Sequence, residues 1–131
     1  MFRVLVFIIL SGALFSAPAL ATNRIIVASV EVEATPAEIW EMWTTEEGLA
    51  FFAPAARIDL RPGGDYEVYF LPDAPEGQRG SEGTSVLGFQ ENRMLTITWA
   101  MPPYMPEVRP HLTPLTIEIM PVSDTLTSVT L

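Results

Sequence analysis

Residues 25–40 read IIVASVEVEATPAEIW, a stretch in which an alternating pattern runs directly into a helix start. Apolar and polar side chains alternate over 25–34, which predicts a β-strand with one buried face. Thr35 fits the N-cap position, Pro36 fits the first helical position, and Glu38 completes a capping box. The fold therefore begins with a strand and a short helix.

A second cap signature, TTEE at 44–47, predicts another short helix that runs to about Phe52 and ends before Pro54. From there the pattern predicts six strands, with a glycine turn at 61–64, a polar loop at 71–80 and a proline-rich loop at 102–114. The expected strands cover residues 56–61, 65–70, 82–89, 95–101, 115–119 and 124–131. Clean alternation favours antiparallel strands with one buried face, and so an α+β fold.

The two expected helices are too small for the sheet that they would have to cover. Together they give roughly 26 Å of helix, which cannot cover six strands. We therefore expect an apolar face that lacks its cover, and an open edge along the last strand, 124–131. Self-association through this face is the expected consequence.

The composition excludes several classes of partner. The chain has 16 acidic and 7 basic residues, a net charge of −9, and it contains no cysteine. An acidic surface repels phosphate backbones and anionic membrane surfaces, so we expect neither a nucleic-acid partner nor membrane binding by the mature chain. Without cysteine, disulfides and thiolate sites are excluded.

Residues 1–21 have the pattern of a secretory signal peptide. Arg3 precedes an uncharged run over 4–15, and Ala19-Leu20-Ala21 is a small-x-small cleavage site. As a helix the run would span about 18 Å, too little for a comfortable membrane crossing. The sequence therefore predicts export, to the periplasm or the medium, and one mature domain at 22–131.

Five motifs in order resemble a known family. They are VEVEATPAEIW (30–40), DLRPGGDY (59–66), GTSVLG (83–88), RMLTITW (93–99) and DTLTSVTL (124–131). This pattern resembles the activator of heat-shock-protein-90 ATPase homologue-like domains of the START/SRPBCC superfamily, which is also called polyketide cyclase-like or Bet v 1-like.

The resemblance implies a helix-grip fold, in which a curved antiparallel sheet of about six or seven strands grips a long C-terminal helix around an apolar cavity. Two short helices follow the first strand. In the family that long helix follows the last strand, whereas this sequence ends at Leu131, so we expect a domain without its C-terminal helix.

The residues offer little for catalysis. His111 is the only histidine and lies in the proline-rich loop, where we expect it to be exposed and not catalytic. One histidine without cysteine cannot supply a usual zinc site, and the acidic residues match no calcium-loop pattern. We therefore predict no catalytic residue, no metal site and no cofactor.

Aromatic residues are more numerous than a thin two-layer core requires. One interpretation is an ordinary core, and the other is the lining of an apolar ligand cavity. The candidate lining residues are Trp43, Tyr66, Phe70, Trp99, Met101 and Tyr104. Tyr69, Thr98 and Arg57 are candidates, with Tyr66 and Tyr104, for the polar groups of such a cavity.

Two active functions remain open. The chain is either an exported domain that binds a small apolar molecule over the sheet, or a cyclase- or hydratase-like enzyme of the same superfamily. A truncated product without function is the third alternative. No acid or base falls on the apolar positions of the strands except Arg93, and the glutamates of the two helices lie near the rims, so the sequence favours binding.

Overall fold

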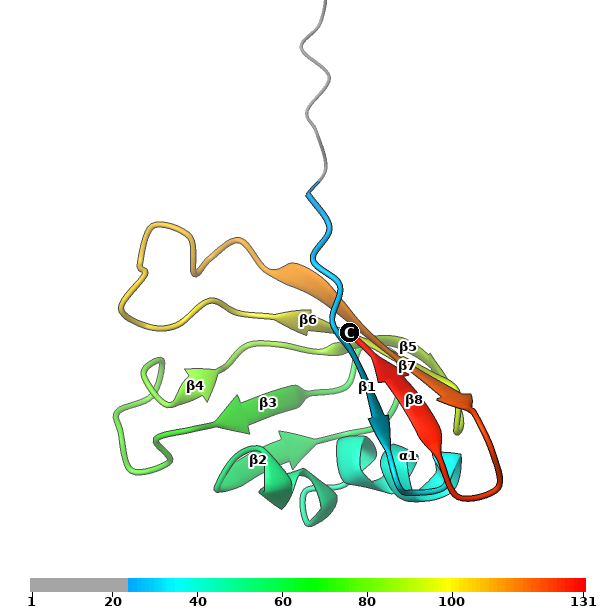
Figure 1. Cartoon of the computed structure of the whole chain (residues 1–131). Coiled ribbons are helices and arrows are strands. Elements are labelled where there is room, and N and C mark those ends of the chain that lie inside the picture. Colours follow the sequence, from blue (N-terminus) through cyan, green and yellow to red (C-terminus); the bar gives the residue numbers. More distant parts are fainter. Residues whose placement is uncertain (1–23) are drawn as a thin grey trace, which may run out of the picture.

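The computed structural model describes residues 24–131 (Figure 1), and the signal peptide expected at 1–21 lies outside them. Its elements in chain order are β1 (Ser29–Val32), α1 (Pro36–Thr44), the 3₁₀ helix η1 (Gly48–Phe51), β2 (Ala55–Ile58), β3 (Tyr66–Tyr69), β4 (Gly80–Ser81), β5 (Val86–Gln90), β6 (Met94–Trp99), β7 (Thr113–Pro121) and β8 (Thr127–Thr130). No helix in this part of the chain is long and apolar enough to cross a membrane.

All strand pairs are antiparallel, and they form a five-stranded sheet and a three-stranded sheet. The first has the order β1-β8-β7-β6-β5 and the second the order β2-β3-β4. An isolated bridge between Asp65 and Ser85 links the two, and the Gly63 amide donates to the Val86 carbonyl at 2.8 Å. The sheets are thus two parts of one strongly curved surface, and the expected α+β helix-grip architecture is confirmed.

Helix α1 starts where the sequence predicted. The Thr35 hydroxyl accepts a hydrogen bond from the Glu38 amide, and the Glu38 carboxylate accepts one from the Thr35 amide at 2.7 Å. The Thr35 amide and hydroxyl both donate to the Glu38 carboxylate, and these two hydrogen bonds hold the pKa of Glu38 below its ordinary value. The second helix is shorter than expected, because the chain forms only the single 3₁₀ turn of η1 after Gly48.

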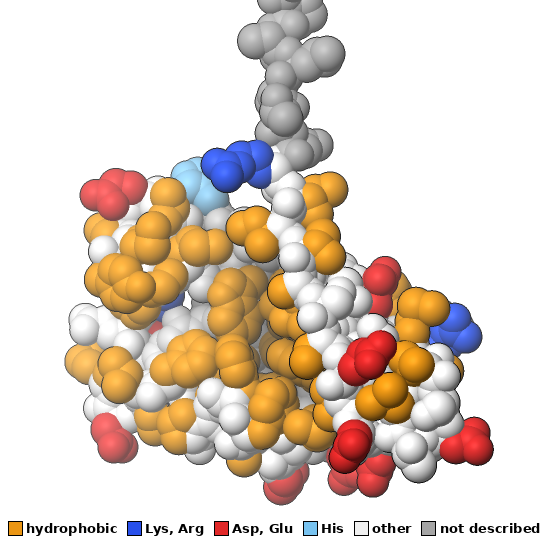
Figure 2. All heavy atoms as spheres, in the orientation of Figure 1, with side chains coloured by type: hydrophobic (Ala, Val, Ile, Leu, Met, Phe, Trp, Pro, Cys, Tyr) orange, Lys and Arg blue, Asp and Glu red, His pale blue; other side chains and the backbone are white. Residues whose placement is uncertain are grey.

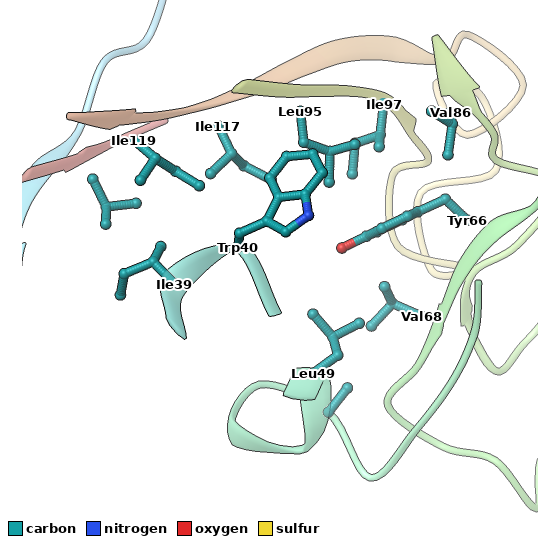
Figure 3. Close-up of a cluster of buried hydrophobic side chains, with 12 residues drawn as sticks. Ile39, Trp40, Leu49, Tyr66, Val68, Val86, Leu95, Ile97, Ile117 and Ile119 are labelled. Carbon is teal, nitrogen blue, oxygen red and sulfur yellow. The ribbon is translucent and has the colours of Figure 1, made fainter. Parts of the chain in front are cut away.

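The core lies inside the curve of the sheet (Figure 3). Tyr66 and Val68 on β3 face Leu95 and Ile97 on β6, and Trp40 of α1 fills the space between them. All four strand residues are at most 1% exposed. The expectation that this apolar face lacks a cover is therefore wrong for its central part, because the curved sheet covers itself with the help of α1 and η1.

The last strand is not an edge. β8 lies between β1 and β7, and its Val129 pairs with Val30 on one side and Ile119 on the other. The expected open edge at 124–131 is corrected by this order. The cause is the first strand, which returns to pair with the last one, so that β1 and β5 form the edges of this sheet.

Candidate functional site

A connected group of aromatic rings joins α1 and η1 to the ends of β3 and β6. We call it the aromatic cluster, and its members are Trp43, Phe51, Phe52, Phe70 and Trp99. Phe52 lies at its centre, with ring centroids 5.3 Å from Phe70 and 6.3 Å from Trp99. Phe51, Phe52 and Phe70 are 53%, 43% and 41% exposed, which is unusual for phenylalanine in a monomer.

A pocket of about 700 Å³ opens beside the cluster. It lies between the loop that joins β3 to β4 and the proline-rich loop that joins β6 to β7, and hydrophobic side chains gather around hollows on this face of the molecule (Figure 2). Its lining is Phe70, Leu71, Gly77, Gln78, Arg79, Gly80, Ser81, Trp99, Ala100, Pro102, Pro103 and Tyr104. The volume lies in the range of small-molecule sites, roughly 300–1,000 Å³.

Three of the six candidate lining residues from the sequence line this pocket. Phe70 directly follows β3, Trp99 is the last residue of β6, and Tyr104 belongs to the proline-rich loop and is 81% exposed. Phe70 and Trp99 also pack against each other, with ring centroids 6.4 Å apart. The ends of β3 and β6 and the proline-rich loop therefore form one apolar wall of the pocket.

The other three lie outside the pocket lining. Trp43 belongs to the aromatic cluster, where its ring is 5.4 Å from that of Phe51. Met101 is half-buried, and its carbonyl accepts a hydrogen bond from Arg109. Tyr66 is a core residue: it is 1% exposed, its hydroxyl donates to the Trp43 carbonyl at 2.7 Å, and burial raises the pKa of its phenol.

The other candidates for polar groups are held elsewhere. Arg57 pairs with Asp65 at 2.8 Å, and the Thr98 hydroxyl accepts a hydrogen bond from the Ser85 amide. Tyr69 donates to the Glu67 carboxylate, and desolvation together with this hydrogen bond raises the pKa of Tyr69 to about 12. Of the proposed polar groups, only Tyr104 lies at the pocket.

Sequence reasoning missed a charged cluster behind the pocket. The Glu82 carboxylate accepts hydrogen bonds from the Gly77 amide, the Arg79 amide and the Arg79 Nε, and Arg109 lies 3.5 Å away. Burial of the carboxyl raises its pKa, but the hydrogen bonds from Gly77 and Arg79 together hold the pKa of Glu82 below its ordinary value. Glu82 is therefore an ionised anchor for the loop.

Metal ligands are not grouped in the described part of the chain. Residues 24–131 contain no set of three or more histidine, cysteine or acidic side chains that would hold a metal ion. His111 is exposed, and its backbone amide donates to the Val108 carbonyl. Among the pocket-lining residues the ionisable side chains are Arg79 and Tyr104, so the lining presents no carboxylate or imidazole.

Comparison with known families identifies the chain. Residues 33–131 match the family model described as Activator of Hsp90 ATPase homolog 1-like protein. This match covers most of the chain and confirms the family that the five sequence motifs indicated. No curated protein matches the sequence.

Solved structures with low sequence identity share the fold. An HSP90 activator from Plasmodium falciparum has a TM-score of 0.62 and 14% identity over 80% of this chain, which spans 68% of that protein. CalU16 from Micromonospora echinospora has a TM-score of 0.56 and 19% identity over 79%, and this chain spans 55% of it. The Aha1 dimer from Colwellia psychrerythraea has a TM-score of 0.57 and 19% identity over 80% of this chain, which spans 72% of that protein.

Proposed function

Because the chain belongs to the Activator of Hsp90 ATPase homolog 1-like family, we propose that it is a binding domain that holds a small apolar molecule in the pocket beside the aromatic cluster. The pocket itself carries this proposal. It has a volume of about 700 Å³, five of its twelve lining residues are aromatic or proline, and it opens beside phenylalanines that are 41–53% exposed. Apolar walls with a few polar groups are typical of ligand sites.

Binding is favoured over catalysis by the chemistry of the lining. General acid–base catalysis needs a titratable group within hydrogen-bond reach of the substrate. Arg79 is paired with Glu82 at 2.6 Å, and Tyr104 is a phenol at the solvent-exposed rim. One group is thus held by a carboxylate and the other lies at the rim, so the enzyme alternative has less support than a carrier or sequestering role.

The first prediction tests the pocket with a neutral fluorescent dye, N-phenyl-1-naphthylamine. We expect saturable binding by the wild-type protein and about tenfold weaker binding by Phe70→Ala, because the substitution removes an apolar wall, about 1.4 kcal/mol of contact. Phe89→Ala is the matched control, since Phe89 is 38% exposed and lies on β5 outside the pocket. Equal losses in the two variants would refute the pocket as the site.

We also propose that two copies associate through the aromatic cluster when no ligand covers it. Exposed apolar patches of this kind often mark interfaces. Phe52→Glu should therefore yield a monomer by sedimentation velocity, whereas Leu87→Glu, at a comparably exposed position on β5, should leave the self-association unchanged. A wild-type protein that sediments as a monomer at every concentration contradicts this part of the proposal.

Export is the remaining part of the proposal. Residues 1–21 have the charge, apolar run and cleavage pattern of a signal peptide. We expect the intact mass of the protein from the periplasm or medium to correspond to residues 22–131, and Ala21→Arg to block processing. A mature mass that retains residues 1–21 would contradict this expectation.

A further inference from the structure

Two loops form opposite sides of the pocket, and one arginine connects them. The loop between β3 and β4 contributes Gly77, Gln78, Arg79 and Gly80 to the lining, and the proline-rich loop contributes Pro102, Pro103 and Tyr104. Arg109 comes from the proline-rich loop. Its Nη2 donates to the Gly77 carbonyl at 3.0 Å and to the Gly80 carbonyl at 2.8 Å.

The same guanidinium also fixes its own loop. The Nη1 of Arg109 donates to the Met101 carbonyl at 2.5 Å, and the Nη2 lies 3.5 Å from the Glu82 carboxylate. The side chains of Arg109 and Glu82 are 17% and 8% exposed, so solvent screens this contact only weakly. The planar guanidinium of arginine has donors on both terminal nitrogens and can make these contacts together. The single ammonium group of lysine cannot.

One of the two walls that Arg109 connects is stiff. Proline locks its own φ angle, so Pro102 and Pro103 reduce the freedom of the backbone that carries them. Deeper in the pocket, the Ala100 amide donates to the Ser81 hydroxyl at 3.1 Å and joins the two loops at their base. The distance between the outer walls therefore depends on the contacts of Arg109 with the carbonyls of the other loop.

From this arrangement we infer that Arg109 sets the width of the pocket and thereby decides which apolar ligands fit. The inference rests on the proposed function and adds a specificity-determining residue to it. The rings of the pocket lie on one side, in Pro102, Pro103 and Tyr104 of the proline-rich loop, and at Phe70 and Trp99. A planar ligand held against these rings by the opposite loop makes more contact with them than a globular ligand does. Loss of Arg109 should widen the gap and remove this preference.

The test combines two neutral alcohols of similar size with Arg109→Met, which keeps the stem and removes the donors. By calorimetry, we expect the wild-type protein to bind 2-naphthalenemethanol about tenfold more tightly than 1-adamantanemethanol. In Arg109→Met the ratio should fall to near one, and Arg109→Lys should lie between. Arg61→Met is the control, because Arg61 is exposed and pairs with Asp59 at 2.7 Å outside the pocket.

Hydrogen exchange of the backbone amides tests the role of Arg109 without relying on ligand binding. In Arg109→Met the amides of Gly77 and Arg79 should exchange about tenfold faster, while the amides of the core strand β6 keep their protection. Unchanged exchange at Gly77 and Arg79, or an unchanged ligand ratio, overturns the inference. If neither alcohol binds the wild-type protein, the proposed function fails, and the selectivity assigned to Arg109 fails with it.

Discussion

Trp40→Ala should destabilise the protein by about 3–5 kcal/mol, because it empties the centre of the core. Trp40 is 8% exposed and lies between the strand residues of β3 and β6 (Figure 3), and its ring also contacts Phe89 at a centroid distance of 5.9 Å. A domain of this size has a total stability of roughly 5–15 kcal/mol. We therefore expect a melting temperature lower by about 15 °C or more.

A second aromatic residue provides the control for this prediction. Tyr104 is 81% exposed, so Tyr104→Ala should change the unfolding free energy by less than about 0.5 kcal/mol. Thermal and denaturant unfolding of the two variants measure the difference. Similar midpoints for Trp40→Ala and the wild-type protein would show that Trp40 does not support the core.

Gly64→Ala should be the most damaging single-methyl change in the glycine turn. A Cβ atom on Gly64 would lie 2.1 Å from the Asp59 carbonyl oxygen, which is backbone and cannot rotate away. The Gly64 carbonyl also accepts a hydrogen bond from the Val86 amide at 2.9 Å and thus joins the two parts of the sheet. We expect a loss of about 3 kcal/mol in the free energy of unfolding.

Substitutions at two other glycines distinguish the steric effect of an added Cβ atom from the effect of the backbone conformation. Gly63 has a φ of +79° but open space at its Cβ position, so Gly63→Ala should cost about 1 kcal/mol. Gly88 has open space and needs no positive φ, so Gly88→Ala should be nearly neutral. The denaturant midpoint should therefore be highest for Gly88→Ala, lower for Gly63→Ala and lowest for Gly64→Ala. Equal midpoints for Gly63→Ala and Gly64→Ala would contradict the steric argument.

The sequence predicted secondary-structure elements well where the signal depends only on neighbouring residues. The capping box at Thr35 and Glu38 needs only a spacing of three residues. The glycine turn and the alternation in β2, β3 and β6 likewise follow from adjacent positions, and the structure places these elements where the sequence indicated. The strand expected at 82–89 begins only at Val86, as β5, and a separate short strand, β4 (Gly80–Ser81), precedes it, with Gly83 at a φ of +69° between the two.

The alternation of apolar and polar residues predicts on which face of a strand a side chain lies. It does not predict how deeply that side chain is buried. Tyr66 and Phe70 both belong to the inner face of the β3 segment, yet Tyr66 is 1% exposed and Phe70 is 41% exposed. The curvature of the sheet, which comes from contacts between distant segments, buries one end and leaves the other open. For this reason the sequence correctly grouped these two aromatic residues but placed Tyr66 in the cavity lining, where the structure does not.

The charged cluster was missed for a related reason. Glu82 was expected in a strand, Arg79 is adjacent to it in a polar loop, and Arg109 comes from a different loop. Nothing in the local pattern connects them. Only the closure of the sheet brings Arg109 within hydrogen-bond distance of the carbonyls of Gly77 and Gly80.

The central claim is that a small apolar molecule binds between Phe70, Trp99 and the proline-rich loop. The most direct measurement is an NMR titration of the isotope-labelled protein with N-phenyl-1-naphthylamine, followed at the backbone amides and the tryptophan indoles. We predict saturable shifts at Trp99, at residues 70–81 and at 100–104, and little change at the indole of Trp40 or in β1. Shifts that are absent, or that map to the opposite face around Leu87, would contradict the account.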